Sequence, residues 1–278
     1  MSGGGDAVTA DRVQAPFGAR LAPVTASERY GAYTVLSCAD STGPRPQAGQ
    51  FYMLMAGERW GGGQDERPFL PRAFSVLRAP AGTDELRFLI EDVGPGTSRL
   101  CELTRSDELS LVGPLGIGFT PPANGRRAVL VGGGVGIAPL VIWHDQLEQR
   151  PVPLLGFRSA AHAAGAELLH SAQVATDDGT VGYHGLVTEL LGAELHRDHR
   201  AQVYACGPPP MLEAVRAMCA ERGVPAQLAL ESGMACGYGA CFGCVVHTRD
   251  GYVRLCVDGP VLDADRLAGV VGTGALAG

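Results

Sequence analysis

The segment AVLVGGGVGIAP, residues 128–139, predicts a buried strand, a glycine-rich loop and the start of a helix in direct succession. Its first four residues are an apolar run, which is typical of a strand inside a parallel sheet, and the helix is expected over 137–149. A glycine loop between a strand and a helix is a site where backbone N–H groups can hold an anion. A plain tight turn is the alternative, and Pro139 replaces the third glycine of the usual Rossmann fingerprint.

Strands and helices continue to alternate after this segment. Residues 152–157 and 201–206 predict further strands, and the helix that follows has apolar residues at helical spacing from Met211 to Cys219 and ends at Gly223. This alternation predicts a parallel sheet with helices on both faces. Such a sheet binds ligands at the carboxyl ends of its strands.

The chain before residue 120 has a different periodicity. Apolar residues recur with period two in short runs from Arg20 to about Phe119, which predicts an antiparallel β-barrel. A breaker cluster at 121–125 marks its end. We therefore expect a flexible N-terminus over 1–14, a barrel over 15–123, an α/β domain over 124–226 and a small cysteine-rich unit over 227–278. The glycine- and charge-rich stretch from Gly57 to Pro68 is expected to be a surface loop.

Four cysteines of the C-terminal unit, Cys236, Cys241, Cys244 and Cys256, follow the order C-x4-C-x2-C-x11-C. This is the order of the ligands of a plant-type 2Fe-2S cluster. A zinc site is the alternative, but zinc ligands usually come as two short C-x2-4-C pairs, and this order has one x2 step. The glycines between the cysteines are expected to let the chain wrap closely and offer N–H donors to the sulfurs. The cluster would then stabilise a unit too small to bury its own core.

The composition excludes several classes of function. The chain has 278 residues, of which 46% are hydrophobic, and a formal net charge of -7. An acidic chain without a run of basic residues is not expected to bind nucleic acid or an anionic membrane, and the longest uncharged apolar run, 128–143, is too short to span a bilayer. No export signal is evident, so we expect a cytoplasmic protein whose isolated cysteines, Cys38, Cys101 and Cys219, pack in the core.

The string Arg72-Ala73-Phe74-Ser75 resembles the flavin motif of the ferredoxin-NADP reductase superfamily, which is an arginine, a variable residue, an aromatic residue and a serine. The resemblance implies that Arg72 pairs with the pyrophosphate of FAD, that Phe74 lies near the flavin ring and that Ser75 bonds near its N5. Without the resemblance, the string is better explained as a strand with an exposed arginine and a core phenylalanine.

A second segment of the same kind runs from Leu89-Ile90-Glu91 into the turn at residues 94–98. The resemblance implies that this segment also binds FAD. Gly96 and Thr97 would open a helix whose free N–H groups hold phosphate. A turn with a helix cap explains these two residues equally well.

The resemblance extends to the dinucleotide. Gly133, Gly134 and Gly136 belong to a stretch that looks like the nicotinamide-dinucleotide loop of the superfamily. The string Cys206-Gly207-Pro208 resembles the one beside the nicotinamide, and residues 176–179 resemble a further stretch near the dinucleotide. A small buried cysteine and a surface turn are the respective alternatives. Cys206 and Ser75 are the expected catalytic residues, and no histidine is given an acid-base role.

The order of barrel, nucleotide domain and cluster, together with residues 113–119 and 256–261, resembles one family. This family is the electron-transfer subunit of NAD-dependent dihydroorotate dehydrogenase. The resemblance implies FAD in the barrel, NAD in the α/β domain and a 2Fe-2S cluster in the last unit, with electrons passing between them. It also implies an FMN-containing catalytic subunit of pyrimidine biosynthesis as the partner, in a heterotetramer with two copies of each. Ala73-Phe74 departs from the proline and aliphatic residue often found there.

The surface near the cysteines is the expected docking face for the partner. Phe242 and Val261 are expected to belong to it, because a cluster must lie near a surface to pass an electron onward.

Two alternative functions stay open. NAD(P)H-ferredoxin or sulfide oxidoreductase subunits share the same layout and are the alternative function. A redox-sensing or zinc-binding module without turnover is the remote one.

Overall fold

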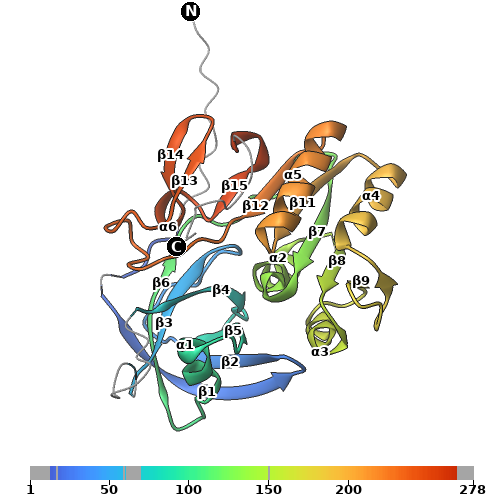
Figure 1. Cartoon of the computed structure of the whole chain (residues 1–278). Coiled ribbons are helices and arrows are strands. Elements are labelled where there is room, and N and C mark those ends of the chain that lie inside the picture. Colours follow the sequence, from blue (N-terminus) through green and yellow to red (C-terminus); the bar gives the residue numbers. More distant parts are fainter. Residues whose placement is uncertain (1–12, 17, 59, 61–69, 150, 268–278) are drawn as a thin grey trace, which may run out of the picture.

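A barrel, a parallel sheet with helices and a small C-terminal unit pack against one another (Figure 1). The computed structural model describes residues 13–16, 18–58, 60, 70–149 and 151–267. The expectations for the N-terminus, apart from residues 13 and 14, and for most of the loop at 57–68 lie outside these residues. Within the described residues, no helix is long and apolar enough to cross a membrane.

Six antiparallel strands form a closed barrel in the order β1-β2-β5-β4-β3-β6. The predicted barrel is thereby confirmed. Its period-two pattern places side chains such as Leu36, Tyr52 and Phe88 in a fully buried interior. A short helix follows the fifth strand. The elements are β1 (Arg20–Tyr30), β2 (Tyr33–Ala39), β3 (Phe51–Ala56), β4 (Arg72–Arg78), β5 (Glu85–Glu91), α1 (Pro95–Cys101) and β6 (Glu108–Leu115).

A buried ion pair joins three parts of the barrel where β1 closes onto β6. The Arg20 guanidinium donates to both carboxylate oxygens of Asp40, over 2.9 and 2.6 Å, and to the carbonyl of Gly113 over 2.8 Å. These residues lie on β1, just after β2, and on β6. Both charged side chains are largely withdrawn from water, so each needs the other as its partner.

The second sheet has seven strands in the order β10-β9-β8-β7-β11-β12-β15, all parallel except the last. Its strands are β7 (Arg127–Gly133), β8 (Val152–Phe157), β9 (Gln173–Thr176), β10 (Tyr183–His184), β11 (Ala201–Cys206), β12 (Ala226–Ala229) and β15 (Val261–Asp263). The accompanying helices are η1 (Gly134–Ile137), α2 (Ala138–Gln146), α3 (Ala160–Ala163), η2 (Ala164–Leu168), α4 (Val187–Arg197), α5 (Pro209–Arg222) and η3 (Ala264–Arg266). The predicted parallel-sheet architecture is confirmed.

The order of the strands fixes where this sheet can bind a ligand. From β7 the chain proceeds outward through β8, β9 and β10, and then returns to β11 on the other side of β7. The two connections diverge, so a crevice opens at the carboxyl ends of β7 and β11. The glycine loop after β7 and the Cys206 loop after β11 both lie at this crevice.

Two predicted boundaries differ from the structure. The helix expected over 137–149 begins as a 3-10 turn at Gly134 and ends at Gln146, because the backbone of Leu147 is already extended. The cysteine-rich unit expected from residue 227 contributes β15 to the large sheet, and the expected boundary falls within β12. The rest of that unit is a hairpin of β13 (Val245–Thr248) and β14 (Gly251–Arg254), followed by α6 (Leu255–Asp258). Strands of three or four residues are too short to show a periodicity of their own.

Removing Asp40 leaves the Arg20 charge buried without its partner. We expect Asp40→Ala to lower the free energy of unfolding by about 3 to 5 kcal/mol. Glu85→Ala is the matched control, because its pair with Arg87 is about one-third exposed and contributes at most about 1 kcal/mol. Urea unfolding followed by circular dichroism compares the two variants. Equal unfolding midpoints would contradict a structural role for the buried pair.

Candidate functional site

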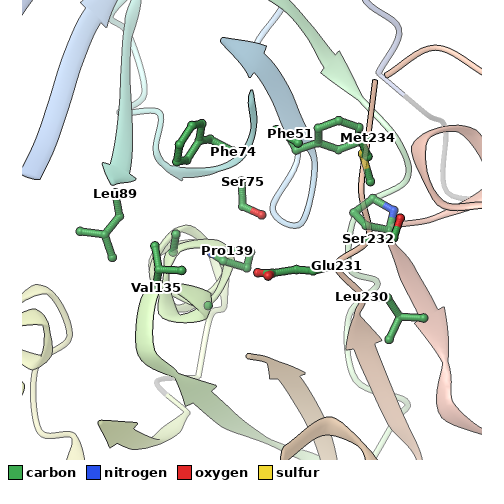
Figure 2. A pocket seen from close by; sticks show the side chains of 14 residues that line it. Phe51, Phe74, Ser75, Leu89, Val135, Pro139, Leu230, Glu231, Ser232 and Met234 are labelled. Carbon is green, nitrogen blue, oxygen red and sulfur yellow. The ribbon is translucent and has the colours of Figure 1, made fainter. Parts of the chain in front are cut away.

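Two cavities lie next to each other where the barrel meets the sheet. The first, of about 180 Å³, is lined by residues of the barrel, the start of α2 and the segment after β12 (Figure 2). The second, of about 700 Å³, lies over the carboxyl ends of the parallel strands and is large enough for a cofactor. Val135, Gly136 and Glu231 line both cavities, so groups bound in the two can approach each other.

The barrel motif at 72–75 faces the first cavity. Ala73, Phe74 and Ser75 line it together with Leu89 of β5. Figure 2 shows Ser75 pointing into the cavity toward Glu231, with Pro139 of α2 nearby. The structure thus brings two predicted flavin segments, which β4 and β5 place side by side, onto the start of the dinucleotide domain.

The other two residues of the second flavin segment lie elsewhere. Successive strand residues point to opposite faces, and the Ile90 side chain is wholly buried in the barrel core. Ile90 can therefore reach a cofactor only through its backbone. Glu91 lines the second cavity, where its carboxylate accepts a hydrogen bond from Arg158 and lies 3.3 Å from Nε2 of His162.

Arg72 and Gly96, predicted separately to meet phosphate, are in contact. A Cβ added to Gly96 would lie 2.8 Å from Nε of Arg72, so only a glycine lets the guanidinium approach the first turn of α1 so closely. The Thr97 hydroxyl accepts from the N–H groups of Val93 and Gly94 over 2.9 and 3.0 Å. The side chain of Thr97 thus caps the helix, and binding of phosphate at this turn stays a prediction.

The glycine loop after β7 packs directly on the loop after β11. A Cβ on Gly136 would lie 2.7 Å from the Cys206 carbonyl and from the backbone of Gly207, and one on Gly133 would collide with the side chain of Met211. Close packing between the loops therefore explains these two glycines. Gly134 differs, because it has a φ of 55° and a Cβ there would meet a single neighbour within 4 Å, the Tyr33 hydroxyl.

Cys206 lies behind this contact and not in a cavity. Its side chain is buried and lines neither cavity, whereas Gly207 and Pro208 line the second. Burial, and to a smaller degree the nearby charge of Glu231, raise the pKa of the Cys206 thiol well above its ordinary value. The residue is a neutral thiol behind the loops, and its predicted catalytic role stays a prediction.

Two residues that sequence reasoning missed are Glu231 and Ser232. They follow β12, and the rule that carboxyl ends of parallel strands line the crevice could have found them had this short strand been predicted. Glu231 is exposed to both cavities, yet protein surrounds it, and this desolvation raises the pKa of its carboxyl. The Ser232 hydroxyl is buried at the first cavity and has no hydrogen-bond partner among the described residues.

The four C-terminal cysteines come together as two pairs. The Cys244 and Cys256 sulfurs are 3.2 Å apart, and the thiol of Cys241 interacts with Cys236. Burial opposes ionisation of Cys236, but backbone N–H groups of residues 238, 240 and 241 and the Cys241 thiol lower the pKa of Cys236 to about 6. Gly239 in between has a φ of 90°, and a Cβ there would collide with Val257. The glycines thus serve the close wrapping that the sequence predicts.

Paired thiols fit a two-iron cluster better than a single ion. A structural zinc site needs four ligands around one point, whereas a 2Fe-2S cluster takes two at each of its irons. The amide groups directed at Cys236 also suit an anionic cluster.

Comparison with known protein families places these features in context. Residues 231–268 match the family model described as the iron-sulfur cluster binding domain of dihydroorotate dehydrogenase B. Curated relatives named dihydroorotate dehydrogenase B (NAD(+)), electron transfer subunit, match most of the chain. The one from Clostridium acetobutylicum is 35% identical over 216 residues, 77% of this chain and 82% of that protein. The one from Bacillus caldolyticus is 39% identical over 210 residues, covering 71% and 79%.

Solved structures share the fold. A chain of an NADH-dependent reduced ferredoxin-NADP oxidoreductase, studied for flavin-based electron bifurcation, has a TM-score of 0.75 at 24% identity and covers 90% of this chain and 91% of its own. A ferredoxin NADP+ reductase from Neisseria gonorrhoeae, solved with FAD and NADP, has a TM-score of 0.56 at 19% identity and covers 74% and 92%. At these identities the likeness concerns the fold alone.

The pairing of the cysteines predicts the metal content. We expect the anaerobically purified protein to contain about two irons per chain. Cys241→Ser should remove the visible absorption of the cluster and most of the iron while the flavin stays bound, because Cys241 lines neither cavity. Cys101→Ser, at a half-buried cysteine in α1, is the matched control and should keep both. Zinc in place of iron by elemental analysis would contradict the assignment.

Proposed function

The chain belongs to the family of the electron transfer subunits of dihydroorotate dehydrogenase B (NAD(+)), and on this premise we propose that it moves electrons between NAD(H), FAD and a 2Fe-2S cluster. The flavin, when bound, accepts two electrons from NADH and releases them singly to the cluster. The protein holds these groups close together and in order. The barrel binds FAD, the parallel-sheet domain binds NAD(H), and the four cysteines bind the cluster.

The observation that carries this function is the path of residues 230–236. Leu230, Glu231, Ser232 and Met234 line the first cavity, and Cys236 stands two residues further on. Two residues of chain span at most about 7 Å. Gly237 then rests on the barrel, where a Cβ would lie 2.5 Å from Met53. One short segment thus links the flavin cavity to the cluster.

The residues around the first cavity support binding of FAD. Ser75 and the buried hydroxyl of Ser232 offer hydrogen bonds to the polar part of a flavin, and Phe74 and Leu89 offer apolar contact to its ring. Arg72 lies against Gly96 at the start of α1, where its guanidinium can pair with the pyrophosphate. Val135 and Gly136 line the second cavity as well, so little more than their loop separates the flavin from the dinucleotide.

The partner is an FMN-containing dihydroorotate dehydrogenase catalytic subunit, which we place in a cytoplasmic heterotetramer with two copies of each chain. Its docking face is the surface around the cysteines, where Tyr238, Phe242 and Tyr252 are 65%, 63% and 77% exposed. The earlier expectation for Val261 is wrong. That side chain is 7% exposed, because it packs into the core cluster of the barrel, where a Cβ on Gly49 would lie 2.8 Å from its methyl group.

The alternative client, a ferredoxin, has one observation in its favour. A chain of the NADH-dependent ferredoxin-NADP oxidoreductase shares the fold over 90% of this chain. Its sequence identity to this chain is only 24%. The curated dihydroorotate dehydrogenase B relatives are 33 to 39% identical, and the family model for their cluster domain matches as well. These matches favour dihydroorotate dehydrogenase as the client.

Removing Arg72 tests the flavin site. We expect Arg72→Ala to weaken FAD binding by about 1.5 to 3 kcal/mol, because the pyrophosphate loses a charge-assisted pair. Flavin content after extensive dialysis is the measurement. Arg87→Ala, at a barrel residue that pairs with Glu85 and lines neither cavity, is the matched control. Full flavin occupancy in both variants would count against Arg72 as a ligand.

Coupling to the partner tests the function. We expect the chain alone to reduce artificial acceptors with NADH without oxidising dihydroorotate, and the coexpressed pair to copurify and reduce NAD with dihydroorotate. Tyr252→Glu should weaken this coupling without changing reduction of the artificial acceptor, because it places a charge on the docking face. Leu21→Glu, at an apolar residue of the barrel that is 60% exposed, is the control. Separate elution without coupling, together with coupling to a ferredoxin, would show that the client is wrong.

A further inference from the structure

Tyr33 is a buried residue whose polar group has no partner. It is the first residue of β2, and its relative exposure is 0%. Its buried hydroxyl makes no hydrogen bond within the described part of the chain, although Tyr33 is one of the residues that line the second cavity. A buried hydroxyl without a partner lowers the stability of a fold by about 1 to 3 kcal/mol. Its presence at a cavity therefore indicates that a bound ligand supplies the missing hydrogen bond.

The hydroxyl faces the open side of the glycine loop. A Cβ on Gly134 would meet a single neighbour within 4 Å, the Tyr33 hydroxyl at 3.9 Å, whereas the loop's other glycines are packed against protein. The φ of 55° at Gly134 keeps the backbone in a conformation that suits glycine. A gap bounded by the loop on one side and by the hydroxyl on the other is therefore left inside the cavity.

Among the described residues that line the second cavity, no Lys or Arg is free to meet the dinucleotide. Arg158 is the one Lys or Arg among the described residues that line it, and it already pairs with Glu91. Asp177 adds negative charge to the same lining, and so does Glu231 when it is ionised. A pyrophosphate bound here must be held mainly by neutral donors, which are backbone N–H groups and hydroxyls.

We propose that the Tyr33 hydroxyl donates a hydrogen bond to a pyrophosphate oxygen of the dinucleotide in the second cavity. The inference rests on the proposed binding of NAD(H) there. Burial, with a smaller contribution from Glu91, raises the pKa of Tyr33, so the hydroxyl stays protonated and remains a donor. Because β2 belongs to the barrel, the dinucleotide then joins the flavin-binding barrel to the parallel-sheet domain.

Tyr33→Phe removes the hydroxyl and keeps the ring. We expect its Kd for NAD+ to rise about tenfold, as for loss of a hydrogen bond to a charged group. ADP-ribose should show the same loss, because it keeps the pyrophosphate and lacks the nicotinamide ring. Calorimetry on the oxidised, flavin-loaded protein measures both. Without a dinucleotide, the variant should melt at the same temperature as the parent or higher, because an unpaired buried hydroxyl has gone.

Tyr52→Phe is the matched control. Tyr52 on β3 is equally buried and its hydroxyl is also unpaired in the described residues, but it lies inside the barrel and lines neither cavity. The Tyr52→Phe variant should show the same effect on the melting temperature and no change in the Kd for NAD+. If Tyr33→Phe leaves both affinities unchanged, or weakens NAD+ and spares ADP-ribose, the pyrophosphate contact is wrong.

Gly134→Ala distinguishes a failure of the Tyr33 inference from a failure of the proposed binding of NAD(H) in the second cavity. Its methyl group enters the gap beside Tyr33, so NAD+ and ADP-ribose should bind more weakly. Weaker binding in Gly134→Ala together with unchanged binding in Tyr33→Phe would overturn the role of Tyr33 alone. Unchanged binding in both variants would show that the dinucleotide does not occupy this cavity, and the proposed function would fail with it.

Discussion

The structure depends on one close backbone-to-backbone contact, which glycines make between the loop that follows β7 and the loop that follows β11. A Cβ on Gly136 would lie 2.7 Å from the backbone of Gly207, and one on Gly207 would lie 3.0 Å from the backbone of Gly133, so either would force the loops apart. This contact lies at the switch point of the sheet, where both connections diverge. Val135 and Gly136 also line both cavities, so a shift of this loop would move the flavin site and the dinucleotide site together.

Each cavity takes residues from two domains, so neither site is complete in one of them. The first cavity needs Pro139 of α2 beside the barrel strands, and the second needs Tyr33 and Glu91 of the barrel. Polar contacts across the interface fix the arrangement. Arg78 of β4 donates to Asp145 of α2 and to the carbonyl of residue 168, both over 2.8 Å. The separation of the cofactors is therefore set by domain packing as well as by the loops.

The sequence predicts those parts of this arrangement that depend on local geometry. Period-two and helical patterns locate the barrel and α5, and the glycine loop and the cysteine spacing mark places where only certain residues fit. The residues that it misses are brought in by tertiary packing. In the sequence pattern, Tyr33 looks like an ordinary apolar strand residue. Its proposed role depends on Gly134, which is about a hundred residues away along the chain. Ser232 and Glu231 follow a four-residue strand whose parallel pairing with β11 cannot be derived from its own sequence.

The cluster unit shows how a segment too small for its own core can still be placed accurately. Residues 230–260 leave the sheet at the end of β12 and re-enter it at the start of β15, and these two strands are antiparallel neighbours with Ala229 opposite Val261. The N–H of Leu230 donates to the carbonyl of Pro260 over 2.9 Å, which closes the base of the insertion. Neighbouring strands lie about 4.8 Å apart, so both ends of the insertion are held together beside the flavin cavity. The position of the cysteines relative to the flavin is thus fixed by backbone pairing in the nucleotide-binding sheet, and the cluster only has to order the loop between its two anchored ends.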